Sequence, residues 1–508
     1  MVMWGGMVYL RPQMSPELLR EAAERQSTSD LLLRPSGPPR TAFPHGNAEE
    51  CEKRETEVRL RVAIVATQDE FDETCIFDMG MVSNTGNGRR YAAQALLRNI
   101  VESECLELVT VLLYDWKNNE NEAESGWVVP TEGPERVAVS VRGGDPVTAW
   151  RGSMSQLLGA VAGELHVDIA ISIQARRSSV ELMQHCVTAK HYVVMGHDYN
   201  LPYGPWGMEV DASTIPGHKE LLEDRKTTML CTSRHLVDFL AHFSTGRVRT
   251  RLCYCADYGY FDPPRHACVP SSAAFPPTVC EDGDCVTLIS PCPSKGLPII
   301  LRLALMLADV RFLCVSTGWT KTLHEVQLQA HPNIEIVQGT DNLDSIYRRT
   351  ALLLMPSLWA ESFGLVAVEA QLRGIPVVST DACGLSEANF LPELRVPRVP
   401  LVHDSRARHM LRGVCMQEAE RTLDPLRPGH ESTEERLQRP LVQQAHTLVA
   451  SEAEAQGFAQ ILRELLGTPQ RRWELGRRAR KLAVGHVQQR RGQLAKTLHE
   501  LAMEGDAG

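Results

Sequence analysis

Short apolar runs alternate with longer amphipathic stretches along most of the chain. Between residues 58 and 265 these runs are "VRLRVAIVAT", "LELVTVLLY", "VDIAISIQ", "HYVVMGHD", "TTMLCTS" and "RTRLCYCA". Continuous apolar runs separated by helical segments are typical of parallel strands that helices cover on both faces. The pattern therefore predicts a doubly wound α/β domain over residues 58–265.

The pattern breaks at "YGYFDPPRHACVPSSAAFPPTVCEDGD", which is dense in Pro, Gly and Asp, and we interpret residues 266–284 as a linker. A second series of apolar runs follows in residues 285–468: "CVTLIS", "VRFLCVS", "IEIVQG", "ALLLMPS" and "IPVVST". Sheets of this kind bind ligands at the carboxyl ends of their strands. Two such domains in succession therefore predict a ligand cleft between them.

Three segments fall outside the two series. Residues 1–57 are rich in Pro, Arg, Ser and Glu without a sustained period, which predicts a flexible N-terminal extension. Residues 404–440 form a polar excursion, and residues 469–508 contain a helix rich in Arg and Lys.

Composition limits the class of protein. A chain of 508 residues with 43% hydrophobic content can build two or three cores, and a formal charge of −10 disfavours a nucleic-acid binder. No apolar run approaches the length of a membrane-spanning helix, and we interpret the apolar start "MVMWGGMVYL" as a ragged terminus.

Several of the 14 cysteines lie inside apolar runs, which favours a reducing compartment, the cytoplasm. A zinc site would require tighter CxxC pairs than these cysteines provide.

Two carboxylates flank the start of a predicted helix after the run "ALLLMPS". In "ESFGLVAVEAQLRG", Glu361 lies in the loop or first turn, Glu369 lies eight residues further, and Gly374 ends the helix. Eight residues correspond to about 12 Å along a helix, which exceeds the spacing of about 5 to 9.5 Å in the carboxyl pair of a glycosidase. The pair suits contacts to two ends of an elongated ligand. The backbone N–H groups between them offer a site for an anion such as a diphosphate; they belong to Ser362, Phe363, Gly364 and Leu365.

The stretch "MPSLWAESFGLVAVEAQLRGIPVVSTDACGLSEA" resembles the signature of glycosyltransferase family 4, a retaining family on the GT-B fold. The resemblance implies two Rossmann-like domains facing a cleft, with the final helix crossing back to the first domain. It also implies that Glu361 approaches the donor sugar and that Glu369 binds the ribose of the nucleotide. The segment from Pro376 to Glu387 matches the following strand and a Gly-x-x-Glu loop of the family. The ordinary alternative is a helix with two solvated glutamates.

The segment "VTLISPCPSKGLPIILRLA" resembles the part of the family in which an Arg and a Lys hold the donor diphosphate. Lys295 stands at the Lys position. The Arg is missing, because its place falls within "SPCP". A charge-assisted hydrogen bond contributes about 1.5 to 3 kcal/mol, so this departure predicts a donor affinity about one to two decades lower unless another basic residue substitutes.

Two places in the first domain match the family more weakly. "SNTGNGRRYAAQALL" puts Gly86 and Gly88 in a loop that opens a helix, where glycines allow a ligand to approach the backbone. An ordinary turn is the alternative. His197 ends the run "YVVMGHD", and the resemblance places it beside the donor sugar; the alternative is a histidine held by backbone hydrogen bonds.

Aromatic and polar residues near His197 add weaker candidates. Tyr199, Tyr203 and Trp206 either stack on a sugar or pack as a lid. For Ser233 and Arg234, packing or surface roles are favoured over a role in the cleft.

Two further patterns favour ordinary explanations. "DGD" at Asp282–Asp284 resembles the metal-binding motif of the other glycosyltransferase fold, but its place in the linker favours a solvated turn. The basic residues of the last helix suggest contact with anionic lipid, although a charged surface is the simpler explanation; they are Arg471, Arg472, Arg477, Arg478, Arg480 and Lys481.

The resemblance and the residues that carry it imply a retaining, hexosyltransferase-type enzyme that needs no metal or other cofactor. Glu361, His197 and Lys295 are its expected catalytic residues, with Glu369, residues 362–365, Gly86 and Gly88 binding the donor. The expected partners are a nucleotide-sugar donor and a sugar, lipid-linked or small-molecule acceptor. Peripheral membrane contact is left open and nucleic acid is excluded. The alternatives are a catalytically silent nucleotide-sugar or glycan-binding protein and, third, a nucleotide-sugar epimerase.

Overall fold

The computed structural model describes residues 2–4, 7–9, 59–67, 88–114, 133–139, 147–161, 165–199, 201–203, 215–261, 283–340, 343–358, 360–397 and 452–505. The chain divides into two compact units, residues 1–57 and 58–508. In the first unit, β1 (Val2–Trp4) pairs antiparallel with β2 (Met7–Tyr9), two strands that the sequence pattern did not predict. Gly86, Trp206, Asp282 and residues 404–440 lie outside the described residues.

The first sheet of the second unit has eight strands in the order β10-β9-β8-β7-β3-β4-β6-β5. Neighbouring strands are parallel except β5 and β6, which pair antiparallel at one edge. The predicted runs form β3 (Leu60–Thr67), β4 (Leu106–Tyr114), β7 (Leu165–Ser172), β8 (Val187–Gly196), β9 (Thr227–Cys231) and β10 (Thr250–Leu252). The edge strand β5 (Glu135–Val139) and its neighbour β6 (Val147–Gly152) were not among those runs.

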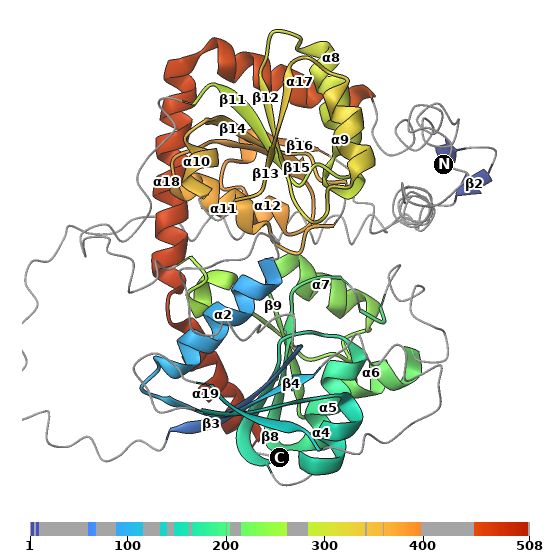
Figure 1. Cartoon of the computed structure of the whole chain (residues 1–508), viewed down its shortest axis with the longest axis vertical. Coiled ribbons are helices and arrows are strands. Elements are labelled where there is room, and N and C mark those ends of the chain that lie inside the picture. The colour runs from blue at the N-terminus through green and yellow to red at the C-terminus, as the bar shows by residue number, and fades with distance from the viewer. Residues whose placement is uncertain are drawn as a thin grey trace, which may run out of the picture. The chain divides into compact units, whose positions relative to one another are not determined.

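Helices cover this sheet on both faces (Figure 1), as a parallel sheet requires. They are α2 (Gly88–Val101), α4 (Met154–Val161), α5 (Arg177–Cys186), α6 (Ile215–Glu223) and α7 (Arg234–Phe243), followed by the short 3-10 helix η4 (Cys255–Tyr258).

The second sheet has six strands, all parallel, in the order β13-β12-β11-β14-β15-β16. Its strands are β11 (Cys285–Ile289), β12 (Phe312–Ser316), β13 (Ile334–Gln338), β14 (Thr350–Met355), β15 (Val377–Asp381) and β16 (Arg395–Pro397). Its helices are η5 (Pro293–Lys295), α8 (Leu297–Met306), α9 (Thr322–Gln329), α10 (Leu343–Tyr347), α11 (Leu365–Leu372), α12 (Leu385–Ala388), η6 (Pro392–Leu394) and α17 (Glu452–Gly467). The predicted fold class, two doubly wound α/β domains, is confirmed.

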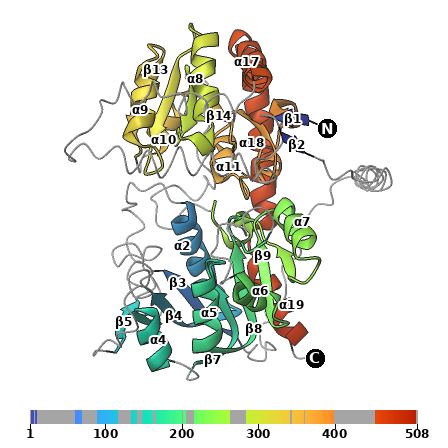
Figure 2. The ribbon, with the colours of Figure 1, turned by 90° about the vertical axis from the view of Figure 1, so that its right-hand side faces the viewer.

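The C-terminal helix is broken in two, which corrects the prediction of one continuous helix. α18 (Pro469–Arg490) ends before Gly492, whose φ of 77° is left-handed, and α19 (Gln493–Gly505) follows. α18 packs against α11 beside the second sheet, and α19 packs against β7 and β8 of the first sheet. Both views show this passage (Figures 1 and 2). Leu494 and Leu498 are fully buried in the core of the first sheet.

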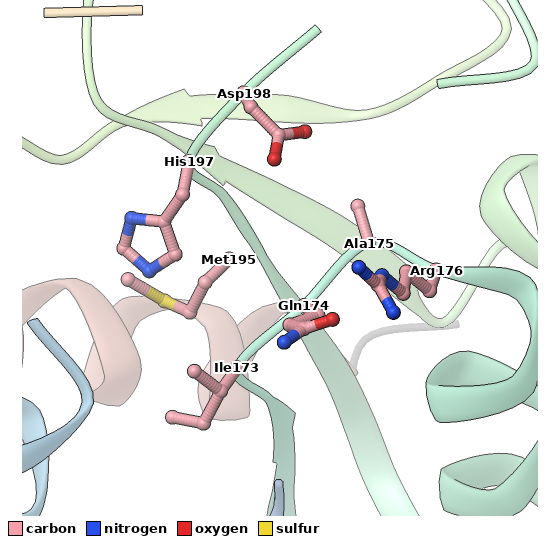
Figure 3. A pocket seen from close by; sticks show the side chains of 7 residues that line it. All are labelled: Ile173, Gln174, Ala175, Arg176, Met195, His197 and Asp198. Carbon is pink, nitrogen blue, oxygen red and sulfur yellow. The ribbon is translucent and has the colours of Figure 1, made fainter. Parts of the chain in front are cut away.

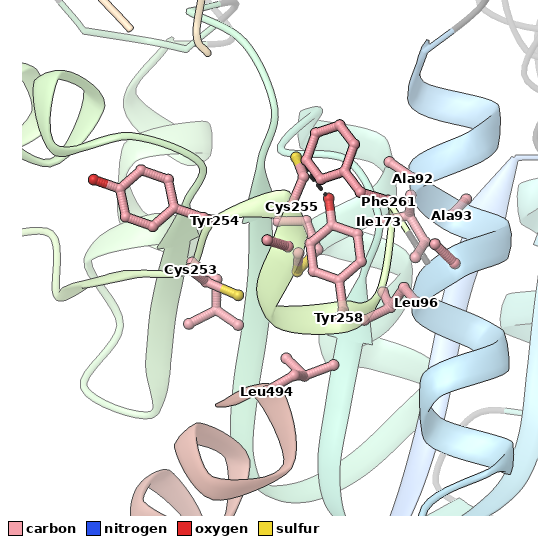
Figure 4. Packing of buried hydrophobic residues seen from close by; sticks show 14 of the residues in the cluster. Ala92, Ala93, Leu96, Ile173, Cys253, Tyr254, Cys255, Tyr258, Phe261 and Leu494 are labelled. Atoms are coloured by element: carbon pink, nitrogen blue, oxygen red, sulfur yellow. Dashed lines mark hydrogen bonds between the residues drawn. The ribbon is translucent and has the colours of Figure 1, made fainter. Parts of the chain in front are cut away.

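A buried layer joins η4 to α2 and α19 (Figure 4). Cys253, Cys255 and Tyr258 are buried there, and the Tyr258 hydroxyl donates to Cys255 Sγ at 3.1 Å. Burial raises the pKa of the Cys255 thiol to about 12. Each cysteine that the structure describes is a free thiol, and all of these but Cys105 are buried. Within the same residues, no helix is long and apolar enough to cross a bilayer.

Candidate active site

The loop after β11 carries Lys295 at the end of η5. Gly296 follows with a left-handed φ of 93°, and a Cβ there would collide with the backbone of Pro356, so only glycine fits. This turn brings η5 against the segment after β14, where the Leu358 N–H donates to the Ser294 carbonyl at 2.9 Å. The Lys295 side chain is 34% exposed and therefore accessible to a ligand.

Lys295 and Glu361 form an ion pair between these two loops. Lys295 Nζ donates to Glu361 Oε1 at 2.5 Å, and Ser357 Oγ donates to the same oxygen at 2.8 Å. Burial lowers the pKa of Lys295, but the charge and hydrogen bond of Glu361 outweigh it, so the net pKa is raised above the usual value. The ammonium group therefore keeps its charge at neutral pH.

Glu369 lies on α11, which begins at Leu365 after the left-handed Gly364 (φ 122°). Of the four backbone N–H groups predicted to face an anion, only that of Leu365 belongs to the first helical turn. The Glu369 carboxylate accepts from two phenols, Tyr347 at 3.2 Å and Tyr260 at 3.3 Å. Burial raises the pKa of Glu369, and Arg373 and these phenols offset the rise only in part.

Ser290 begins the segment "SPCP", within which the resemblance expects the second cation of the diphosphate site. It has a left-handed φ of 59°, and its hydroxyl shares a hydrogen bond of 2.7 Å with Thr317 Oγ1. The segment "SPCP" thus provides a hydroxyl at the end of β11 and no positive charge.

His197 follows β8 in the first sheet. Its backbone carbonyl accepts from Ser362 Oγ at 2.5 Å, which joins the ends of β8 and of the Glu361 loop. The side chain lines a small, shallow depression at the carboxyl ends of β7 and β8 (Figure 3). The depression has three apolar and four polar lining residues: Ile173, Ala175, Met195, Gln174, Arg176, His197 and Asp198.

Tyr199 and Tyr203, which follow His197, are part of the core. Tyr199 is fully buried, and its hydroxyl forms a hydrogen bond of 2.6 Å with His235 Nδ1. Tyr203 is 1% exposed and donates to Glu223 at 2.9 Å. Both tyrosines therefore pack inside the core of the first sheet, which neither predicted alternative, stacking on a sugar or packing as a lid, describes. Gly88, the first residue of α2, is the one glycine of its predicted loop that the structure describes.

Ser233 and Arg234 have structural roles at the start of α7. Ser233 is the N-cap, and its hydroxyl accepts from the Leu236 N–H at 3.2 Å. The Arg234 N–H donates to the Glu387 carboxylate at 3.0 Å.

The sequence comparison matched Glu387 to a family loop without giving it a role. It gave no signal for Tyr260 or for Tyr254, which donates to Glu387 at 2.7 Å. A tyrosine beside a proline-rich segment has no pattern that distinguishes a site residue from a core residue.

The two motifs with ordinary explanations are accounted for. Asp284 is exposed and pairs with Arg311, as a solvated turn predicts. On α18, Arg471 pairs with Glu464 at 2.6 Å, Arg478 pairs with Glu393, Arg480 donates to the Leu372 carbonyl and Arg477 stacks on Trp473. Four of the six basic residues thus have partners within the protein.

The architecture is shared with known structures. Anabaena HepE, solved in complex with UDP and glucose, superimposes with a TM-score of 0.51 over 87% of this chain and 100% of its own, at 15% identity. The two doubly wound domains therefore define the GT-B fold.

The second domain also matches by sequence. Residues 287–393 match the family model of the glycosyl transferases group 1. D-inositol 3-phosphate glycosyltransferase of Mycobacterium leprae is 34% identical over 118 residues, 21% of this chain and 27% of that relative. The Mycobacterium tuberculosis relative of the same name is 34% identical over 106 residues, 19% of this chain and 22% of its own. The chain thus spans about a quarter of the curated relatives it matches. Residues 287–393 are therefore similar to the group 1 glycosyl transferases, and the chain has the GT-B fold.

Proposed function

We propose that this protein is a retaining glycosyltransferase that moves a sugar from a nucleoside diphosphate donor to a hydroxyl acceptor. The Lys295–Glu361 pair carries the proposal. It lies at the carboxyl ends of β11 and β14, inside the segment that matches the family, and is held by a glycine turn and by Ser357. Ligands bind at this edge of parallel sheets.

Lys295 is the proposed electrophilic group. An ammonium has three N–H donors, and Glu361 takes one of them. The others can contact phosphate oxygens, so Lys295 would stabilise the negative charge that develops on the departing diphosphate. Glu361 and the His197 side chain would hold the donor sugar. No metal is needed for this step, because a fixed cation supplies the charge stabilisation.

Glu369 would anchor the ribose. Its carboxylate already accepts from two hydroxyl groups, those of Tyr260 and Tyr347. A ribose diol offers the same kind of donor. The backbone of residues 362–365, with Gly86 and Gly88, would border the donor, as the sequence predicts.

The small depression beside His197 borders the proposed position of the donor sugar. Its apolar residues suit the face of a sugar ring, while the Gln174 amide and the Asp198 carboxylate suit its hydroxyl groups. A cytoplasmic location stays a prediction from the buried thiols.

The test is release of nucleoside diphosphate from UDP-, GDP- and ADP-sugars, with and without EDTA, and with simple sugar and lipid acceptors. UDP-glucose comes first, because HepE was solved with UDP and glucose. We expect release from one donor, insensitive to EDTA and lost in Glu361→Gln. The matched control is Glu335→Gln, which removes a carboxylate paired with Arg349 on the surface of the same domain.

Ser290 favours one alternative, a catalytically silent protein that binds a nucleotide sugar. A hydroxyl pair in place of the second cation weakens stabilisation of a leaving diphosphate. If every donor stays intact while one raises the melting temperature, this alternative replaces the transferase proposal.

A further inference from the structure

Glu387 connects the two halves of the protein. It lies on α12 after β15 of the second sheet, and its carboxylate caps α7, which follows β9 of the first sheet. Oε2 accepts from the Arg234 N–H at 3.0 Å, and Oε1 accepts from the His235 N–H at 2.9 Å. These are the first two residues of the helix, where N–H groups lack partners within the helix and the helix dipole favours a negative charge.

The cap of α7 is divided between two domains. Ser233, the N-cap, accepts from the third N–H group, that of Leu236, at 3.2 Å. The Glu387 carboxylate accepts from the first two N–H groups of the helix, although it lies about 150 residues away in the sequence. Tyr254, just after β10, donates to Glu387 Oε2 at 2.7 Å and so holds the carboxylate in place. If the second domain moves away, α7 loses two of the three hydrogen bonds that cap its N-terminus.

The same loop of Glu387 packs against the Glu361 loop. The Gly384 N–H donates to the Glu361 carbonyl at 2.9 Å. A Cβ at Gly384 would collide with the Ser362 carbonyl, so the two loops touch through their backbones. A displacement of Glu387 is therefore transmitted directly to the backbone of Glu361.

The hydrogen bonds that start at Glu387 continue through α7 to the His197 loop. His235, capped by Glu387, bonds the Tyr199 hydroxyl at 2.6 Å. Tyr199 lies two residues after His197, whose carbonyl accepts from Ser362. The contacts thus close a ring through the Glu361 loop, the Glu387 loop, α7 and the His197 loop.

We propose that Glu387 is a positioning residue whose cap on α7 holds the His197 loop and the Glu361 loop together, so that it sets the closed arrangement of the two domains. Closure of this kind completes a catalytic site and excludes water. The kinetic part of the proposal rests on the proposed transferase function. The structural part does not.

The test compares Glu387→Gln with Glu393→Gln by amide hydrogen exchange of the full chain. The substitution keeps the shape of the side chain and removes the charge and one acceptor. Glu393 is the matched control, because it lies a few residues away and pairs with Arg478 at the surface. In Glu387→Gln we expect exchange to rise about tenfold or more in three places, the start of α7, residues 196–199 and residues 360–364. The control should match the wild type.

With a donor that is turned over, kcat of Glu387→Gln should fall about tenfold, about 1.4 kcal/mol, while the donor KM stays within about twofold. If the wild type turns over no donor, the transferase proposal fails, and the exchange result still decides the role of Glu387.

Three outcomes would overturn the proposal: faster exchange confined to α7, which describes a simple helix cap; equal changes in the Glu393 variant; and a KM effect without a kcat effect. Should Glu387→Gln not fold, Tyr254→Phe removes one of the three hydrogen bonds. Amide exchange in Tyr254→Phe must then rise at the same three places, by a smaller factor.

Discussion

Lys295 Nζ lies 2.5 Å from Glu361 Oε1, so the cation proposed to stabilise the leaving group and the carboxylate proposed to hold the donor sugar position each other. The Glu361 side chain is 13% exposed and that of Lys295 is 34% exposed. Removing either member of such a partly buried pair leaves the other charge without its partner. The two residues should therefore act as a unit.

Lys295→Met should lower kcat by a factor of about 10² to 10³, about 2.7 to 4 kcal/mol, because the leaving diphosphate loses a fixed cation. In a double-mutant cycle with Glu361→Gln, the two losses should not add. Single-turnover release of nucleoside diphosphate measures the rate loss of each single variant and of the double variant. Full wild-type turnover in Lys295→Met would remove this residue from the reaction.

Glu369→Gln should weaken donor binding and leave kcat at saturating donor nearly unchanged. A hydrogen bond to a charged group contributes about 1.5 to 3 kcal/mol, so Kd should rise about 10- to 150-fold. Calorimetry with UDP and with the free sugar separates the two ends of the donor. Only the UDP affinity should change. Equal losses for both ligands would contradict a contact to the ribose.

The stability of the protein should depend on pH through the protonation of His486 on α18. Burial, and then the charge of Arg490, lowers its pKa to about 4 from an ordinary 6.5. The unfolded chain thus takes up a proton below about pH 6.5 that the folded state refuses until about pH 4, so stability is lost as pH falls through this window.

His486→Phe tests this titration, because the ring already packs against Tyr254, Phe363 and Phe390, and its buried Nε2 atom has no hydrogen-bond partner among the described residues. The gain in unfolding free energy over wild type, from urea titrations, should grow between pH 6.5 and 4. A gain that stays constant across this range would exclude titration of His486 as the cause.

Gly384→Ala should destabilise the protein and reduce turnover, because the added methyl group collides with the Ser362 backbone and separates the two site loops. Strain of this kind costs about 1 to 3 kcal/mol. Gly485→Ala is the matched control. A Cβ there meets nothing within 4 Å, and the residue lies inside α18, so we expect stabilisation of up to about 1 kcal/mol. The melting temperatures of the two variants should therefore change in opposite directions, and only Gly384→Ala should lower donor turnover.

Local hydrophobic patterns in the sequence predict much of the fold. Buried parallel strands must be apolar on both faces, so runs such as "VDIAISIQ" and "ALLLMPS" reveal β7 and β14 directly. At the edge of the sheet, β5 has exposed residues at Glu135 and Arg136, and neither β5 nor the adjacent β6 gave a comparable run. The break at Gly492 interrupts a basic helix in which one glycine, on sequence alone, is tolerated.

The sequence by itself determined the two parallel sheets and the absence of a cation within "SPCP", and it predicted roles for Glu361, Lys295 and Glu369, because each of these depends on neighbouring residues. Only the tertiary structure decided which groups these side chains meet. Tyr260 is 109 residues from Glu369, and Glu387 is 153 residues from the N–H group of Arg234. Such contacts arise from the packing of one domain against the other, and no local periodicity or propensity encodes that packing.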